Sequence, residues 1–209
     1  MFVFDRFLIK PNVKIEMIKR PFSKKQIQTL RKVLDERPRD LTLLNVGVDT
    51  ALRGGDLLGL KVSDVKTEWG EIRESFYVKM KKTGKQVLCE LSQNSILSLE
   101  RWLKVSNKDT DDFIFTSVRG GSVPITAVHF RRIIKSWCDE CGWDEKFFSS
   151  HSIRKSLPTE LYKQTKDLRS CQILLGHQSI GNTAHYLGIN EENNFLPELP
   201  KNKVDILYL

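Results

Sequence analysis

Cysteine is scarce in this sequence, and its few cysteines form no recognisable framework. The 209 residues include four of them, Cys89, Cys138, Cys141 and Cys171. Cys138 and Cys141 have C-x-x-C spacing, but a zinc site of that kind needs a second pair, and the sequence contains none. The composition argues against a disulfide-rich secreted fold, and we expect free thiols in a reducing compartment and no metal site.

Long hydrophobic runs are also missing. The apolar stretch over residues 1–10 is interrupted by Asp5 and Arg6, and Pro11 follows it. It is too short to span a membrane and too charged to form the core of a signal peptide. We therefore expect a cytoplasmic protein with no membrane partner.

Acidic residues are outnumbered by basic ones. The chain has 34 Lys and Arg against 26 Asp and Glu, which gives a net charge of +8 and a pI near 9.3. This balance favours a polyanionic partner such as nucleic acid, although taken alone it is weak support. The length and a hydrophobic content of 40% suit one domain, or two small ones, with a proper core.

Hydrophobic periodicity predicts a mostly helical chain with one β-hairpin. Apolar stripes, which include Val33 and Val128 as inward-facing residues, predict helices over residues 24–36, 40–53, 92–106 and 125–141. Residues 75–80 and 86–91 are rich in β-branched and aromatic residues, and a turn at Thr83-Gly84 joins them. The hairpin tip therefore carries several lysines.

The stretch from His151 to Tyr186 gathers the residue types of a reaction centre. His151 and Arg154 are three positions apart, so on a helix they share one face. Gly176 is typical of the residue that ends an apolar helix, and it displays His177 directly after that end. Tyr186 then falls within the next helical segment.

Three features shape the helices of this stretch. Pro158 removes the hydrogen bond to the carbonyl of Arg154, so we expect a kink or an early helix end there. Asp167 can cap the helix that ends at Gly176. Ser179 or Asn182 can cap the helix that carries the tyrosine.

At these residues the chain resembles the tyrosine recombinase family, also called phage-type integrases. The family pattern is H-x-x-R, then L-G-H, then a tyrosine nine positions later, and all three parts match. Thr50–Leu60 is similar to the family's upstream arginine box, with Asp56 where glutamate is commoner, and Lys82-Thr83-Gly84 is similar to its K-T-G hairpin. The resemblance covers about Pro21 to Ile189, and the ordered set is far more specific than any one motif.

The resemblance implies a mainly α fold with a small antiparallel β-sheet, an α+β class, which is the catalytic-domain fold of tyrosine recombinases. It implies an enzyme that cleaves and rejoins DNA through a 3′-phosphotyrosine intermediate, without a metal or another cofactor. It assigns catalysis to Arg53, Lys82, His151, Arg154, His177 and the nucleophile Tyr186.

The residue types fit this chemistry, although each also has a plain structural alternative. Arginine holds two phosphate oxygens and stabilises the charge that develops on them, whereas alone Arg53 would fit a helix-end salt bridge and Arg154 a solvated face. Tyr186 can form a covalent phosphotyrosine, whereas a lone tyrosine is more often a half-buried aromatic. His151 suits acceptance of the tyrosine proton and His177 suits a hydrogen bond to phosphate, and each would more often be structural alone.

The hairpin lysines supply the remaining charges. Lys82 suits the general acid that protonates the leaving 5′ oxygen, with Lys81 and Lys85 as alternatives on the same turn; a solvated charge is the plain alternative for all three. Lys155, directly after the second arginine, either contacts phosphate or is solvated. Lys81, Lys85 and Lys155 are therefore DNA-binding candidates, and Asp56 is a candidate for orienting the first arginine or a histidine.

We expect three segments along the chain. Residues 1–20 form an N-terminal arm that is too short for the family's N-terminal core-binding domain, and residues 21–189 form the catalytic domain. Residues 190–209 form a C-terminal tail whose apolar end either docks on a neighbouring subunit or folds back. The resemblance implies double-stranded DNA as the partner and a homotetramer on a recombination site, with an accessory DNA-bending protein or a second recombinase left open.

The resemblance favours a site-specific recombinase that integrates or excises a mobile element, in a prokaryote or encoded by a phage and associated with the nucleoid. Two alternatives remain. A type IB topoisomerase uses similar chemistry to relax supercoils, and a regulatory DNA-binding protein can use this fold without catalysis. Recombinant junction products would exclude the topoisomerase, and a covalent adduct on Tyr186 would exclude the non-catalytic regulatory protein.

Overall fold

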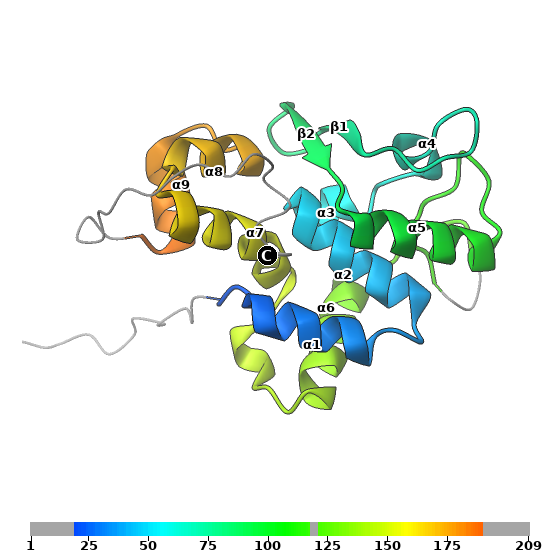
Figure 1. Cartoon of the computed structure of the whole chain (residues 1–209), viewed down its shortest axis with the longest axis horizontal. Helices are drawn as coiled ribbons and strands as arrows, with labels where there is room; N and C mark the ends of the chain where they lie inside the picture. Colours follow the sequence, from blue (N-terminus) through cyan, green and yellow to red (C-terminus); the bar gives the residue numbers. More distant parts are fainter. Residues whose placement is uncertain (1–18, 118–120, 190–209) are drawn as a thin grey trace, which may run out of the picture.

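The computed structural model describes residues 19–117 and 121–189, which form a mainly helical fold with one small antiparallel sheet (Figure 1). The strands are β1 (Ser75–Lys79) and β2 (Gln86–Glu90). The helices are α1 (Lys24–Val33), α2 (Pro38–Thr50), α3 (Gly54–Leu57), α4 (Val62–Val65), α5 (Gln93–Ser106), α6 (Ala127–Glu140), the short 3-10 helix η1 (Glu145–Phe147), α7 (Ser150–Thr165), α8 (Leu168–Leu175) and α9 (Ile180–Leu187). The predicted fold class is confirmed.

Helix α2 is the buried scaffold of the domain. It packs against α5 on one side and α7 on the other (Figure 1), and Leu43, Leu44 and Val48 are fully buried. It begins at Pro38, two residues before the predicted start, because proline is well suited to the first turn of a helix. It ends at Thr50, the first residue of the arginine box.

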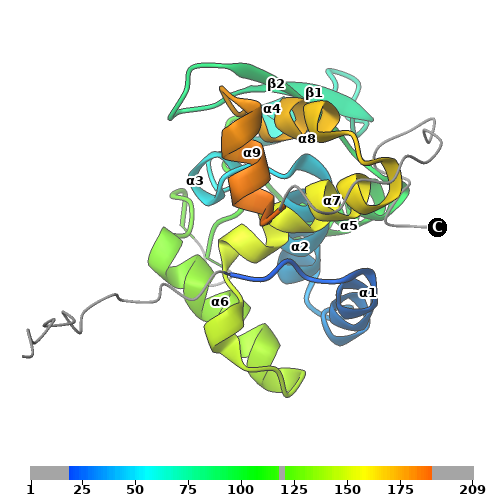
Figure 2. The same ribbon diagram turned by 90° about the vertical axis from the view of Figure 1, so that its left-hand side faces the viewer.

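The β-hairpin is confirmed with the predicted strands. Phe76 lies opposite Cys89 and Val78 lies opposite Val87, so one face of the hairpin is apolar. This face is buried against α8 and α2, while the outer face leaves Tyr77 exposed. Seen from the side, the hairpin crosses above α8 and α9 (Figure 2), so its lysine-bearing turn belongs to the same end of the domain as those helices.

Two helical stripes differ from the prediction. Val128 is 56% exposed, because the stripe of α6 that faces the core consists of Phe130, Ile133, Ile134 and Trp137. Val128 lies two positions before the first of these residues, which turns it about 200° away on a helix. Val33 is 36% exposed, since α1 ends there and the following Leu34 takes the core position.

Helix α7 does not stop at Pro158 but continues to Thr165, so of the expected kink or early end, the early end was wrong. Leu157 and Leu161 on either side of the proline are buried in the core, and this burial offsets the missing backbone hydrogen bond. The caps that follow were predicted correctly. Asp167 accepts a hydrogen bond from Ser170 N at the start of α8, and Ser179 caps α9 in the same way.

Gly176 lies where the end of α8 packs closely against the hairpin. It ends α8 with φ of +58°, a left-handed conformation that favours glycine. A Cβ atom built on it would lie 1.9 Å from Met80 Cε and 2.9 Å from Val87 Cγ2. The end of α8 therefore touches the hairpin at a distance that only a glycine permits.

Gly176→Ala should reduce the free energy of unfolding by roughly 2–4 kcal/mol, because left-handed strain and overpacking against Val87 add together. Gly142→Ala is the matched control, since Gly142 also has positive φ but its added Cβ would meet no atom within 4 Å. The control should lose only about 1–2 kcal/mol from backbone strain. Equal losses in urea denaturation would show that the close approach at Gly176 contributes nothing.

Candidate active site

The first turn of α7 places two of the predicted residues one helical turn apart. Ser149 caps the helix, accepting a hydrogen bond from His151 N at 3.2 Å, while Ser149 N donates to Ser152 Oγ at 3.0 Å. This reciprocal cap fixes where the helix begins. It thereby fixes His151 at the surface and Arg154 one turn further into the protein.

Arg154 is a buried anchor, with 3% of its surface exposed. Its Nη1 donates to the carbonyl of Ala51, after the end of α2, and its Nη2 donates to the carbonyl of Leu175 at 2.8 Å, at the end of α8. Burial lowers the pKa of Arg154 to about 10, so it stays charged at neutral pH. The alternative of a solvated face is therefore wrong for this residue.

Arg53 reaches the same region from the loop between α2 and α3. It is half-buried, and its Nη1 donates to the sulfur of Met80 at 2.9 Å. Among the described residues Arg53 forms no ion pair, which leaves the helix-end salt bridge without support. Asp56 is buried and accepts a hydrogen bond from Lys81 N at 2.9 Å, so it ties the arginine box to the hairpin rather than to a histidine.

His177 follows Gly176 and is held by its backbone and by its ring. Its carbonyl accepts a hydrogen bond from Gln172 Nε2 at 3.2 Å, and its Nδ1 lies 3.2 Å from the hydroxyl of Thr183. Burial lowers its pKa to about 4, and the charges of Arg154, Arg53 and then Lys85 act in the same direction. The imidazole is therefore neutral at pH 7.

Tyr186 stands where these side chains converge. Its hydroxyl lies 3.4 Å from His151 Nδ1, and His177 approaches its ring edge-on with the ring centroids 5.3 Å apart. The guanidinium carbon of Arg154 lies 5.9 Å and Lys155 Nζ 4.7 Å from the tyrosine ring centroid. Four side chains, three from α7 and one from the loop after α8, thus meet at the phenol of Tyr186 on α9.

The protonation of this group follows from its surroundings. Burial raises the pKa of Tyr186, and the charges of Arg154 and Arg53 oppose that rise. The pKa of His151 is lowered, first because protein atoms displace water from the ring and then because Arg154, Lys155 and Arg53 repel a proton. A neutral His151 that carries its proton on Nε2 has a lone pair on Nδ1, which can accept a hydrogen bond from the phenol.

The hairpin lysines differ in their contacts. Lys81 Nζ donates to the carbonyl of Gly55 at 3.4 Å, and Lys85 Nζ donates to the carbonyl of His177 at the same distance. Lys82 is exposed on the turn, and no contact is described between it and the other predicted catalytic residues. Lys155 is only 7% exposed, so the solvated alternative is wrong for it. The structure thus brings Lys85 and Lys155 to the site, whereas Lys81 contacts the arginine box.

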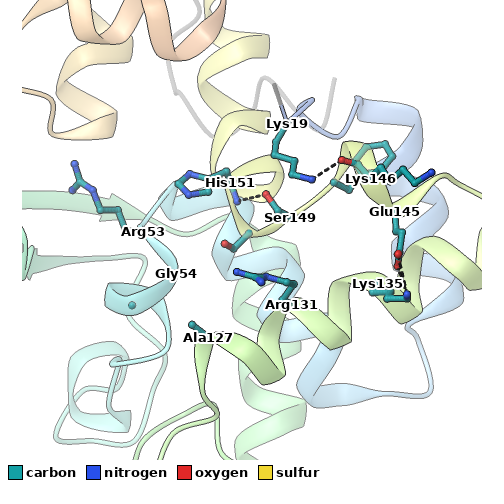
Figure 3. Close-up of a pocket in the computed structure, with 13 residues that line it drawn as sticks. Lys19, Arg53, Gly54, Ala127, Arg131, Lys135, Glu145, Lys146, Ser149 and His151 are labelled. Carbon is teal, nitrogen blue, oxygen red and sulfur yellow. Dashed lines mark hydrogen bonds and ion pairs between the residues drawn. The ribbon is translucent and has the colours of Figure 1, made fainter. Parts of the chain in front are cut away.

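A basic cavity of about 820 Å³ adjoins the site and was not predicted (Figure 3). It is shared by Arg53 and His151 and extends to Arg131 on α6. Its other cations are Lys19, Lys135 and Lys146, of which Lys135 pairs with Glu145 at 2.8 Å. These residues come from segments far apart in the sequence, so no motif or spacing revealed them. Only the high overall content of basic residues hinted at such a surface.

Other kinds of site find little support in residues 19–117 and 121–189. No three His, Cys, Asp or Glu side chains there are grouped so that they could hold a metal ion. None of the helices in these ranges combines the length and the apolar character needed to cross a membrane. Cys89, Cys138 and Cys171 are buried thiols outside any disulfide bond in these ranges, as expected for core cysteines, and Cys141 is half-buried.

Comparison with known proteins agrees with this geometry. The sequence profile of the phage integrase family matches residues 20–193. The probable integrase/recombinase YoeC of Bacillus subtilis is 31% identical over 174 residues, which cover 81% of this chain and 89% of that protein. Tyrosine recombinase XerD of Proteus mirabilis is 31% identical over 74% of this chain and 49% of its own length. The chain thus spans about half the length of that relative.

A solved structure shares the fold. The crystal structure of XerA recombinase superposes with a TM-score of 0.70 at 24% identity, covering 83% of this chain and 62% of that one. At this identity the likeness shows the fold alone, whereas the family profile extends over most of the chain and includes the site described above. This chain belongs to the phage integrase family of tyrosine recombinases.

Proposed function

We propose that this protein is a site-specific DNA recombinase that cleaves one strand with Tyr186 and rejoins it to a partner strand. The observation that carries the proposal is the contact between the Tyr186 hydroxyl and His151 Nδ1, beside a buried Arg154. A tyrosine packed only for structure needs no neutral base at its hydroxyl and no buried cation beneath it. A nucleophile that attacks a phosphodiester needs both.

The two arginines bind the scissile phosphate. Arg154 has five N–H donors, and its two described hydrogen bonds to carbonyls leave others for a phosphate oxygen. Arg53 is held by a thioether, a weak acceptor that an anionic phosphate would readily replace. As the phenol attacks, negative charge grows on the non-bridging oxygens, and these fixed cations stabilise it.

Proton transfer completes the reaction. His151 takes the proton of Tyr186, and its lowered pKa means that the imidazole is unprotonated at neutral pH and has a lone pair for that proton. Lys82 donates a proton to the leaving 5′ oxygen. Lys82 sits at the tip of the hairpin, so bound DNA would have to draw it towards the site, whereas Lys85 already contacts the His177 loop. Asp56 orients the hairpin, and Lys81, Lys85 and Lys155 contact the DNA backbone.

The partner is double-stranded DNA that carries a recombination site. A solved relative in fold, XerH recombinase, was crystallised with its difH substrate before cleavage, and the basic cavity beside Arg53 supports the same class of ligand here. We propose that protomers assemble on DNA as a tetramer. Residues 1–20 would form an arm, and the apolar end of residues 190–209 would dock on a neighbouring protomer. Residues 1–18 and 190–209 lie outside the described residues. Integration or excision of a mobile element is the role we propose.

Tyr186→Phe should abolish the covalent protein–DNA adduct while leaving DNA binding intact, because only the hydroxyl is lost. The measurement is gel detection of adduct on a nicked recombination-site duplex that traps the intermediate. Tyr77→Phe, at a tyrosine that is 65% exposed on the hairpin, is the matched control and should form the adduct normally. Adduct formation by Tyr186→Phe would assign the nucleophile elsewhere.

The general acid can be identified by the leaving group. Lys82→Ala should cleave an ordinary duplex at least about 10²-fold more slowly, the low end of the usual contribution of a general acid. A duplex with sulfur in place of the bridging 5′ oxygen should restore its rate, since a thiolate leaves without a proton. Rescue of Lys85→Ala instead of Lys82→Ala would assign the role to the lysine that contacts the His177 loop.

Arg131 in the basic cavity should contribute a phosphate contact. Arg131→Ala should reduce the slope of log affinity against log salt by about 0.9, the value for one released counterion. Lys104→Ala on α5, outside this cavity, is the control and should keep the wild-type slope. Fluorescence anisotropy with a labelled duplex over a salt series measures both, and an unchanged slope in Arg131→Ala would exclude the cavity from the DNA-binding surface.

A further inference from the structure

Thr183 takes no part in the proposed reaction, yet its side chain contacts His177, a predicted catalytic residue. Its side chain on α9 is fully buried. Its Oγ1 lies 3.2 Å from Nδ1 of His177 and 3.3 Å from the carbonyl oxygen of Ser179, one helical turn earlier. A buried hydroxyl between a carbonyl and an imidazole has consequences for where the imidazole carries its proton.

The hydroxyl of Thr183 has one hydrogen and two neighbours. The Ser179 carbonyl can only accept, and threonine in a helix commonly donates to the carbonyl four residues earlier. When the hydroxyl donates there, Nδ1 of His177 must be the donor in the other hydrogen bond. The neutral ring then carries its proton on Nδ1, and Nε2 has a lone pair.

This tautomer does not match a phosphate ligand. A lone pair on Nε2 would face the lone pairs of a phosphate oxygen, so a favourable hydrogen bond requires a second proton on the ring. In the free protein that proton is disfavoured, because the pKa of His177 is about 4, owing to burial and to Arg154, Arg53 and Lys85. The ring of Tyr186 also lies against His177, and because its pKa is raised it is a neutral phenol at pH 7.

A bound phosphodiester reverses this balance. Its negative charge lies among the cations that repel a proton from His177, and it attracts one directly. The pKa of His177 must therefore rise on binding, and the proton comes from solvent. Both ring nitrogens are then donors, one to Thr183 and one to the phosphate.

We propose that Thr183 is a positioning residue that holds His177 in its Nδ1–H tautomer, so that Nε2 takes up a proton when a DNA phosphate binds and donates it in a hydrogen bond to that phosphate. The proposal rests on the proposed function, since it requires a phosphate beside His177. If His177 takes up this proton, DNA affinity rises as the pH falls from the pKa of His177 in the complex towards its lower pKa in the free protein.

The tautomer is tested first, on the free protein. Long-range ¹H–¹⁵N NMR at pH 7, with the ring signals assigned from His→Gln variants, distinguishes a proton on Nδ1 from one on Nε2. Wild type and Thr183→Ser should have the Nδ1–H form of His177, and Thr183→Val should shift towards the Nε2–H form. Wild type in the Nε2–H form would overturn the proposal, whatever the activity of the enzyme.

Proton uptake is tested on the complex. Calorimetric titration with a recombination-site duplex at pH 6, in buffers of different ionisation enthalpy, counts the protons bound. Uptake by wild type and Thr183→Ser should exceed that of Thr183→Val by up to one proton per bound protomer. The DNA affinity of wild type and Thr183→Ser should therefore change with pH more steeply than that of Thr183→Val, by up to tenfold per pH unit. Equal uptake by wild type and Thr183→Val would overturn the linkage.

The control is Thr165→Val, since Thr165 is also buried and donates to the carbonyl four residues earlier, Leu161 O at 2.8 Å, without touching a histidine. It should leave the tautomer and the proton uptake unchanged. A change equal to that of Thr183→Val would mean that loss of a buried helix hydroxyl alone is responsible, which would overturn the proposal. The absence of a Tyr186 adduct would instead defeat the proposed function and leave the tautomer result standing.

Discussion

The buried guanidinium of Arg154 is the interaction on which the arrangement of this site depends. It donates to carbonyls after α2 and at the end of α8, so a single side chain from α7 joins the ends of two other helices. The C-terminal end of a helix carries partial negative charge, which stabilises a cation that burial would otherwise disfavour. The residue that would bind phosphate therefore also fixes the positions of Arg53 and His177, because each follows one of these two helix ends.

The same cation sets the protonation of its neighbours. With Arg53 it lowers the pKa of both His151 and His177 and opposes the rise in the pKa of Tyr186. The free site thus holds two neutral imidazoles and a neutral phenol between fixed cations. Such a site is electrostatically incomplete until an anion enters, and a phosphodiester would supply that charge beside Tyr186, the proposed nucleophile.

The hairpin is coupled to this centre by close packing as well as by charge. Gly176 allows Met80 and Val87 to approach the end of α8, and Met80 in turn contacts Arg53. Asp56 binds the backbone of Lys81, so the turn is fixed at one side while Lys82 remains exposed. Lys82, the proposed general acid, is therefore exposed at the tip of the hairpin, while the start of the turn is held against the arginine box.

The sequence by itself determined the helices, the hairpin and the order of the predicted catalytic residues, because periodicity, caps and motif spacing are local properties of the chain. Even so, the predicted inward position of Val128 was wrong, and of the kink or early end expected at Pro158 the early end was wrong, because the packing of the whole helix decides both outcomes. Only the tertiary structure decided that Arg154 is an anchor, that Arg131 lies in a cavity beside the site, and that Thr183 contacts His177. The physical reason is that burial, electrostatic repulsion and hydrogen-bond partners depend on distances between segments, and no spacing along the chain encodes those distances.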